Sequence, residues 1–174
     1  MKKTLIVALS LVIVAILVGF IVVRNGSNEK LEGVVNTGVN NTLNTVTNTS
    51  TVLNLSGQGL TKVPEYVFSR TDLVELNLSN NLLIDALPSQ IGNLKKLKVL
   101  NLSNNKFIGV PAEVGQLKNL EVLNLSNNQL TGLPFEIGNL LNLKLLDVSG
   151  NQYSESDFLT IQKNLPPTTI IKIK

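Results

Sequence analysis

The chain repeats itself with a period of 23 or 24 residues, and this period restricts its fold more than any other feature. The stretch VLNLSNN occurs at 99–105 and at 122–128, and ELNLSNN at 75–81 is nearly a third copy. A unit of this length cannot bury its apolar residues alone, so the repeats are expected to stack into a solenoid. Each repeat begins with an L-x-L pair, at Leu53, Leu76, Leu100, Leu123 and Leu146.

Side chains of a short strand alternate between its two sides, and this alternation sorts the letters of each repeat. We expect Leu76 and Leu78 to point into a core, while Glu75, Asn77 and Ser79 point outward on the concave side. An asparagine that follows five residues after the first leucine is expected to turn inward and bridge backbone groups that no strand or helix serves. These structural asparagines are Asn81, Asn105, Asn128 and Asn151, whereas Gln58 stands in the first repeat and indicates an end cap.

The second half of each repeat contains a proline and a glycine at fixed places. The prolines at 64, 88, 111 and 134 are expected to start a short helical or turn segment, because proline fixes φ in the helical range. The glycines at 92, 115 and 138 are expected to end that segment. Between them, Ile91, Val114 and Ile137 are expected to enter the core from the convex side.

The pattern L-x-x-L-x-L-x-x-N at this period resembles the leucine-rich repeat family, over about 120 of the 174 residues. The segments LPSQIGNLKKL, VPAEVGQLKNL and LPFEIGNLLNL are similar to the subtype with an L-P-x-x-I-G-x-L convex segment. The resemblance implies an α/β solenoid, a short curved horseshoe with parallel strands on its concave face. It does not imply one function, because such scaffolds serve unrelated tasks. The lack of cysteine-rich caps, together with the MKK start, predicts a bacterial member.

The end of the chain departs from the repeat and predicts a cap. The segment SESDFLTIQKNLPP favours a helix that starts at Ser154, Ser156 or Asp157 and runs to about Leu165. The final TIIKIK predicts a last strand with charged residues on its outward side, which would block further stacking. In that strand Ile171 and Ile173 are expected to point inward, and Lys172 and Lys174 outward.

Residues 4–23 form an apolar block of 20 residues without a charge. At about 1.5 Å per residue a helix of this length spans roughly 30 Å, the hydrocarbon thickness of a bilayer. Lys2 and Lys3 outweigh Arg24, so the N-terminus is expected in the cytoplasm and the repeats outside it. A cleavable signal peptide is the alternative and would give a secreted or envelope structural protein. Against it, the apolar run exceeds the usual length of about 7–15 residues, and VGFIVVRNG lacks an A-x-A-like cleavage site.

Residues 24–50 contain seven Asn and five Thr and are interpreted as a linker. Its later part could instead pair with the first repeat as an edge strand. The predicted organisation is therefore a transmembrane anchor or signal segment at 1–23, a linker at 24–50 and a repeat domain at 51–174.

The chain has no His and no Cys, which excludes Ser-His-Asp and Cys-His catalysis, disulfides and ordinary zinc sites. Glu113 and Glu136 occupy equivalent places in neighbouring repeats but are expected on the outer surface, where nothing would raise a carboxyl pKa. We therefore predict a non-enzymatic protein without a cofactor or a metal. Residues 24–174 hold 13 Lys and Arg against 12 Asp and Glu, so no nucleic-acid partner is expected. The sequence makes no prediction of oligomeric state.

The concave face is the best candidate for a binding surface. An exposed apolar row beside an amide row is suited to an extended peptide or a glycan, and proteins that resemble this one usually bind there. The alternative is that β-branched residues merely favour strands and nothing binds. The apolar column is Val52, Glu75, Val99, Val122 and Leu145; the amide column is Asn54, Asn77, Asn101, Asn124 and Asp147; the third column is Ser56, Ser79, Ser103, Ser126 and Ser149.

Overall fold

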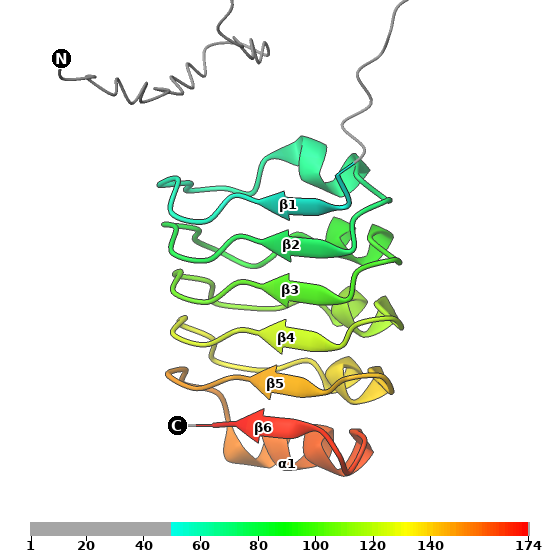
Figure 1. Ribbon diagram of the computed structural model, residues 1–174. Coiled ribbons are helices and arrows are strands. Elements are labelled where there is room, and N and C mark those ends of the chain that lie inside the picture. The colour runs from blue at the N-terminus through cyan, green and yellow to red at the C-terminus, as the bar shows by residue number, and fades with distance from the viewer. Residues whose placement is uncertain (1–49, 174) are drawn as a thin grey trace, which may run out of the picture. The chain divides into compact units, whose positions relative to one another are not determined.

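The computed structural model describes residues 50–173. The predicted membrane segment 4–23 and nearly all of the predicted linker lie outside these residues. Within residues 50–173, no helix is both long enough and apolar enough to cross a membrane. The described part is a stack of similar coils, each of which contributes one strand to a common sheet (Figure 1).

Six short parallel strands form this sheet in chain order. Equivalent residues of neighbouring strands pair directly, so that Leu53 lies beside Leu76 and Leu76 beside Leu100. Each repeat therefore returns the chain to the same place one strand further on, and the prediction of a parallel-stranded solenoid is confirmed. The strands are β1 (Val52–Asn54), β2 (Glu75–Asn77), β3 (Val99–Asn101), β4 (Val122–Asn124), β5 (Leu145–Asp147) and β6 (Ile170–Lys172).

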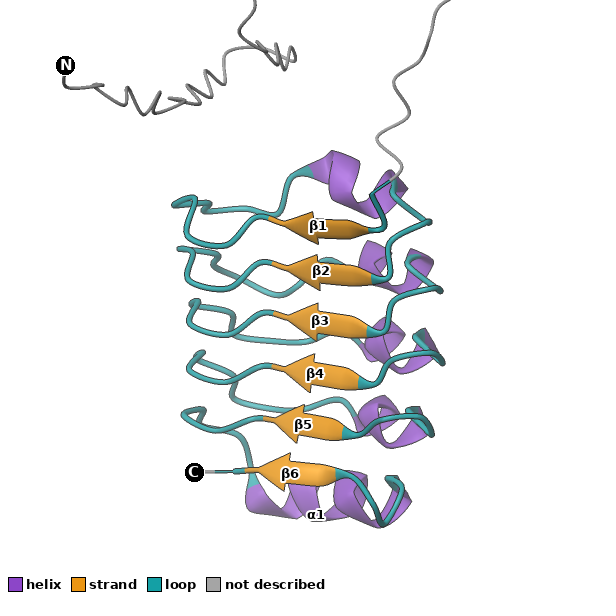
Figure 2. Ribbon diagram, in the orientation of Figure 1, coloured by secondary structure: helices purple, strands orange, loops and turns teal. Residues whose placement is uncertain are grey.

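A short 3-10 helix occupies the opposite side of each of the first four coils, as Figure 2 shows. Each begins directly after a proline in the extended conformation, with φ between −59° and −75°. Proline suits this place because its φ is already close to the helical value. The segments are η1 (Glu65–Ser69), η2 (Ser89–Asn93), η3 (Ala112–Gln116) and η4 (Phe135–Asn139).

The glycines at 92, 115 and 138 do not end these segments, and that prediction was wrong. Each segment continues by one further residue, and none of the three glycines has a positive φ. Their role is close packing between coils. A Cβ atom built on Gly115 would lie 2.4 Å from the carbonyl oxygen of Glu136 in the next coil. Only glycine lets neighbouring 3-10 segments approach this closely.

A single apolar core runs along the stack between the sheet and the 3-10 segments. Leu76, Leu100 and Leu123 of the strands are fully buried, and Ile91 and Val114 enter from the opposite side. At the first coil Leu53, Leu60 and Val63 are only partly buried, as are Tyr153 and Ile171 at the last. The stacked repeats thus cover each other in the middle and leave both ends of the core partly open.

The step of 24 residues between β2 and β3 includes one extra residue in the loop after β2. Asp85 takes it up with a left-handed φ of 64°. The next residue, Ala86, then forms a parallel bridge with Gly109 of the following coil. The insertion is absorbed in the loop, so the register of the strands is unchanged.

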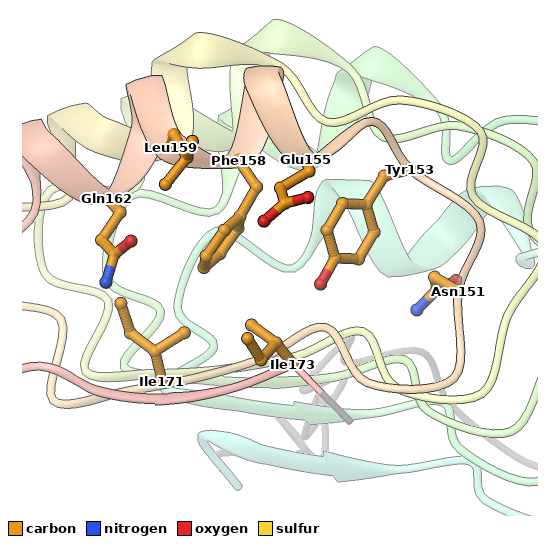
Figure 3. A pocket seen from close by; sticks show the side chains of 8 residues that line it. All are labelled: Asn151, Tyr153, Glu155, Phe158, Leu159, Gln162, Ile171 and Ile173. Atoms are coloured by element: carbon orange, nitrogen blue, oxygen red, sulfur yellow. The ribbon is translucent and has the colours of Figure 1, made fainter.

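A ten-residue helix, α1 (Glu155–Asn164), packs at the last coil. Ser154 precedes it and Leu165 follows it, in the segment where the sequence predicts a helix. Strand β6 then runs beside β5 and ends at Lys172. Ile171 is half-buried, whereas Ile173 is 49% exposed and does not enter the closed core as predicted. Figure 3 shows its side chain on the helix side, where it lines an open cavity instead.

Candidate functional site

The inward asparagines hold the ends of the strands in place. Asn128 is 8% exposed, and its Nδ2 donates to the carbonyl oxygens of Leu102 and Leu125 at 3.0 Å and of Ser126 at 3.2 Å. Its Oδ1 accepts from the backbone N–H of Phe107 at 3.0 Å. One amide thus bonds to its own coil and to the preceding coil. Equivalent bonds are made by Asn81, Asn105 and Asn151.

A second asparagine row was missed by the sequence reasoning. The side chains of Asn80, Asn104 and Asn127 form an exposed ladder, with Nδ2 to Oδ1 distances of 3.0 and 2.9 Å. All three residues have a left-handed φ between 53° and 56°. The signal was available, because glycine occurs at the equivalent positions 57 and 150 and asparagine tolerates the same conformation.

The apolar column of the concave face lies in direct register across β1–β5. Val52, Val99 and Val122 occupy equivalent places in their strands, as do Glu75 and Leu145. Val52 is 48% exposed, Glu75 is exposed and the other three are half-buried. The structure therefore places these five residues in one solvent-facing line, broken by a carboxylate at β2.

The amide column shows a polarity that the sequence did not predict. Asn101 Oδ1 accepts from the backbone N–H of Ser103 at 3.1 Å and from its hydroxyl at 2.8 Å. In the other four repeats the equivalent N–H also donates to Oδ1, and at Asn124 and Asp147 the serine hydroxyl donates as well. These turns end the strands and occupy the acceptor atom of each side chain. Among residues 50–173, the Nδ2 groups of Asn54, Asn77, Asn101 and Asn124 donate to no protein acceptor.

The third column is not a ligand-facing row, contrary to the sequence-based expectation. Ser79, Ser103 and Ser126 are only 4–6% exposed. The chain turns inward directly after these serines, toward the structural asparagines, and the hydroxyls of Ser103 and Ser126 bond to the amide column. The candidate binding surface is therefore two columns wide.

The hollows on the described part of the chain include a smaller one on the sheet and a larger one beside the last helix. A depression of about 180 Å³ on the concave face spans β1–β3, and Asn54, Glu75 and Asn101 contribute to its lining. A larger cavity of about 470 Å³ lies between α1 and β6 at the end of the core (Figure 3). There the rings of Tyr153 and Phe158 have centroids 5.7 Å apart, and burial, followed by the charge of Asp147, raises the pKa of Tyr153.

The smaller depression is the better candidate for a binding site, because two registered columns of side chains converge on it and continue beyond it. The larger cavity has mixed walls, with Phe158, Leu159, Ile171 and Ile173 as apolar lining and Asn151, Tyr153, Glu155 and Gln162 as polar lining. It lies where the core is incompletely covered. No group of three or more acidic side chains within residues 50–173 is arranged to hold a metal ion.

A row of charges borders the start of the strands. The carboxylate of Glu121 lies 3.5 Å from Nζ of Lys98 and 2.5 Å from Nζ of Lys144. The hydrogen bond from Lys144 is the main reason why the pKa of Glu121 is lowered, and the charge of Lys98 adds to it. The row joins three successive repeats at the surface.

Glu121→Gln is expected to reduce stability near pH 7 and to have little effect near pH 2. Because the pKa of Glu121 is lower in the folded protein, its stabilising effect is present above the unfolded-state pKa and is lost as the pH falls through the folded-state value. Urea denaturation at both pH values measures this difference. Glu136→Gln, which alters an exposed carboxylate on the convex side, is the control. An equal effect of Glu121→Gln at both pH values would contradict the stabilising role assigned to the ionised carboxylate of Glu121.

Comparison with known proteins gives a consistent result. The family model described as "Leucine-rich repeat region" matches residues 51–166. Receptor-like protein 34 of Arabidopsis thaliana is 44% identical over 57 residues, which are 33% of this chain and 6% of that protein. The chain thus spans less than a tenth of the curated relatives it matches.

Two solved structures extend the likeness to the whole stack. A leucine-rich repeat protein of Leptospira interrogans has a TM-score of 0.57 and 35% identity, over 70% of this chain and 36% of the other. The plant peptide hormone receptor RGFR1 in complex with RGF2 has a TM-score of 0.57 and 35% identity, over 69% of this chain and 21% of the other.

Proposed function

Because the chain belongs to the leucine-rich repeat family, we propose that it is a non-enzymatic binding module that takes a linear ligand on its concave face. The ligand lies across the strands and meets the apolar column and the amide column together. The residues that meet it are Val52, Asn54, Glu75, Asn77, Val99, Asn101, Val122, Asn124, Leu145 and Asp147.

The observation that supports this proposal most is the register of the sheet. Every strand from β1 to β4 presents one asparagine amide beside one residue of the apolar column, at the same height as its neighbours. A ligand with a regular spacing can therefore make the same contact several times. RGFR1 is described as a peptide hormone receptor in complex with RGF2, which supports ligand binding as the role of such a scaffold.

The N-terminal apolar segment is proposed to tether this module to a membrane, with the repeats on the extracytoplasmic side. The support is the sequence: 20 uncharged residues follow Lys2 and Lys3. A secreted or envelope structural protein, released by signal cleavage, is the second candidate. A bacterial source is part of the same proposal. The likeness to the Leptospira interrogans protein favours it, although the curated relatives are from a plant.

Protease shaving of intact cells tests the tether. A chain with a C-terminal tag should sediment with membranes, and external protease should release a fragment with the mass of the repeat domain. A mature protein that begins beyond residue 20 would instead identify the secreted form. A tag that stays protected until the cells are lysed would contradict the proposed orientation.

A substitution on the apolar column tests the binding face. The full chain would be screened against a peptide library and a glycan array, and retained probes would be measured again on Val99→Lys. Binding should fall at least tenfold, because a lysine there adds a charge and a long side chain to the middle of the face. The matched control is Gln90→Lys on η2 of the convex side, which should bind normally. Equal binding by Val99→Lys would contradict the proposal.

A further inference from the structure

The amide column of the concave face offers more hydrogen-bond donors than acceptors. The Oδ1 atoms of Asn101 and Asn124 each accept two hydrogen bonds from the strand-ending turns, and those of Asn54 and Asn77 accept one. Their NH₂ groups have no protein partner within residues 50–173 and are not buried away from solvent, and an amide NH₂ can only donate. A ligand that lies along this column must therefore present acceptor oxygens at matching intervals.

The spacing of the donors restricts the ligand further. Neighbouring strands lie about 4.8 Å apart, so the donors recur at that interval. An extended peptide presents same-side carbonyls every ~6.8 Å and would drift by about 6 Å over three steps. A polyproline II peptide presents one side every ~9.3 Å and would reach only every second amide.

A β-1,4-linked sugar chain also brings its N-acetyl carbonyls to every second amide, but its ring oxygens can reach the amides between them. Each pyranose ring advances by about one strand spacing and carries acceptor oxygens of its own. Successive rings are turned over, so an N-acetyl carbonyl faces the protein at every second ring, beside every second asparagine. The acetyl methyl groups and the C–H faces of the rings suit the valines of the neighbouring column.

Charge on the face agrees with a neutral ligand that also carries hydroxyl donors. Glu75 is exposed within the depression on β1–β3, where its carboxylate can accept from ring hydroxyls. Lys172 lies 4.0 Å from Asp147, so this pair offsets its own charge. No cluster of cations marks the described face for a polyanion.

Building on the binding role proposed above, we propose that the concave face binds a linear β-1,4-linked chain of N-acetylated amino sugars. The four amide NH₂ groups donate to carbonyl and ring oxygens, the apolar column contacts methyl groups and ring faces, and Glu75 accepts from hydroxyls. The polymer crosses β1 to β4 at about one ring per strand.

Asn→Asp substitutions separate this donor role from the structural role of the column. Asp147 already makes the same turn with a carboxylate at β5, with bonds to Ser149 of 3.1 and 2.6 Å. The double variant Asn101→Asp and Asn124→Asp should therefore keep the strand-ending turns while it removes two donors. Circular dichroism and urea denaturation establish that it is folded.

Isothermal titration of the full chain in mild detergent provides the test. The N-acetylglucosamine hexamer should bind, and cellohexaose, which has the same linkage but no acetyl carbonyl, should bind at least tenfold more weakly. The double Asn→Asp variant should lose at least tenfold in affinity, because each lost hydrogen bond contributes about fivefold. Glu113→Gln on the convex side should bind as the unaltered chain does.

The two proposals fail in different ways. No binding of the hexamer up to millimolar concentration, or equal binding by the double variant, would overturn the amino-sugar proposal. If a peptide from the library, such as a polyproline II sequence, binds and is lost in Val99→Lys, the concave binding role stands and the ligand class is wrong. If the hexamer binds and Val99→Lys leaves it unchanged, both proposals are contradicted.

Discussion

Asn128→Ala is expected to lower the free energy of unfolding by about 3 kcal/mol. The change removes an acceptor from the backbone N–H of Phe107 and a donor from three carbonyl oxygens of two successive coils. The N–H of Phe107 is left without a partner, which costs about 1–3 kcal/mol, while each of the three carbonyl oxygens keeps one other donor and loses a bond that alanine cannot replace. Urea denaturation followed by circular dichroism measures the loss.

Asn139→Ala is the matched control for this change. Asn139 is the last residue of η4, its side chain is exposed, and it makes no side-chain hydrogen bond within residues 50–173. Its replacement should change stability by less than about 0.5 kcal/mol. Similar losses of unfolding free energy in the two variants would show that the inward amide does not stabilise the stack more than an exposed asparagine does.

Gly115→Ala is expected to cost about 3 kcal/mol through a different mechanism. The new Cβ would lie 2.4 Å from the carbonyl oxygen of Glu136 and 2.8 Å from its carbonyl carbon. Both atoms belong to the backbone, so η3 and η4 would have to move apart. Overpacking of a closely packed site usually costs about 1–3 kcal/mol, and rigid backbone on the far side favours the upper end. The same denaturation experiment measures the effect.

Gly132→Ala is the corresponding control, because a Cβ at Gly132 has no neighbour within 4 Å and its φ is not positive. We expect a neutral or slightly stabilising effect, since alanine restricts the unfolded chain. A Gly115→Ala variant as stable as Gly132→Ala would contradict the close approach of the coils. Both variants should leave the concave columns unchanged.

The sequence predicted the sheet well because its information is periodic. Leucines at a fixed interval require equivalent burial in every coil, and this requirement sets both the parallel order and the register of β1–β5. The prolines likewise placed the starts of the 3-10 segments. In both cases a residue type recurs at the same position of each repeat because it has the same structural role there.

One error fell where two neighbouring coils meet, which a single repeat does not reveal, and another fell where the chain leaves the strand. The glycines at 92, 115 and 138 looked like ends of segments, whereas their reason is the backbone of the next coil. Serines that alternate outward by strand period are buried, because the chain turns inward directly after them. The alternation of inward and outward side chains therefore ends one residue earlier in the repeat than expected.

The amino-acid sequence alone does not show that the amide column presents mainly hydrogen-bond donors. An asparagine offers both a donor and an acceptor, and only the hydrogen bonds to the following serines show which is free. The exposed ladder of Asn80, Asn104 and Asn127 differs in this respect, because its amides bond to each other. Two similar rows of asparagines thus have different capacities for binding.

The most direct test is an NMR titration of the ¹⁵N-labelled full chain, read on the side-chain NH₂ signals. The probes are the N-acetylglucosamine hexamer and the peptides retained in the library screen. The binding account predicts shifts at Asn54, Asn77, Asn101 and Asn124, with little change at the inward Asn128. Shifts confined to the NH₂ signal of Gln162, at the cavity between α1 and β6, with the amide column unchanged, would contradict it.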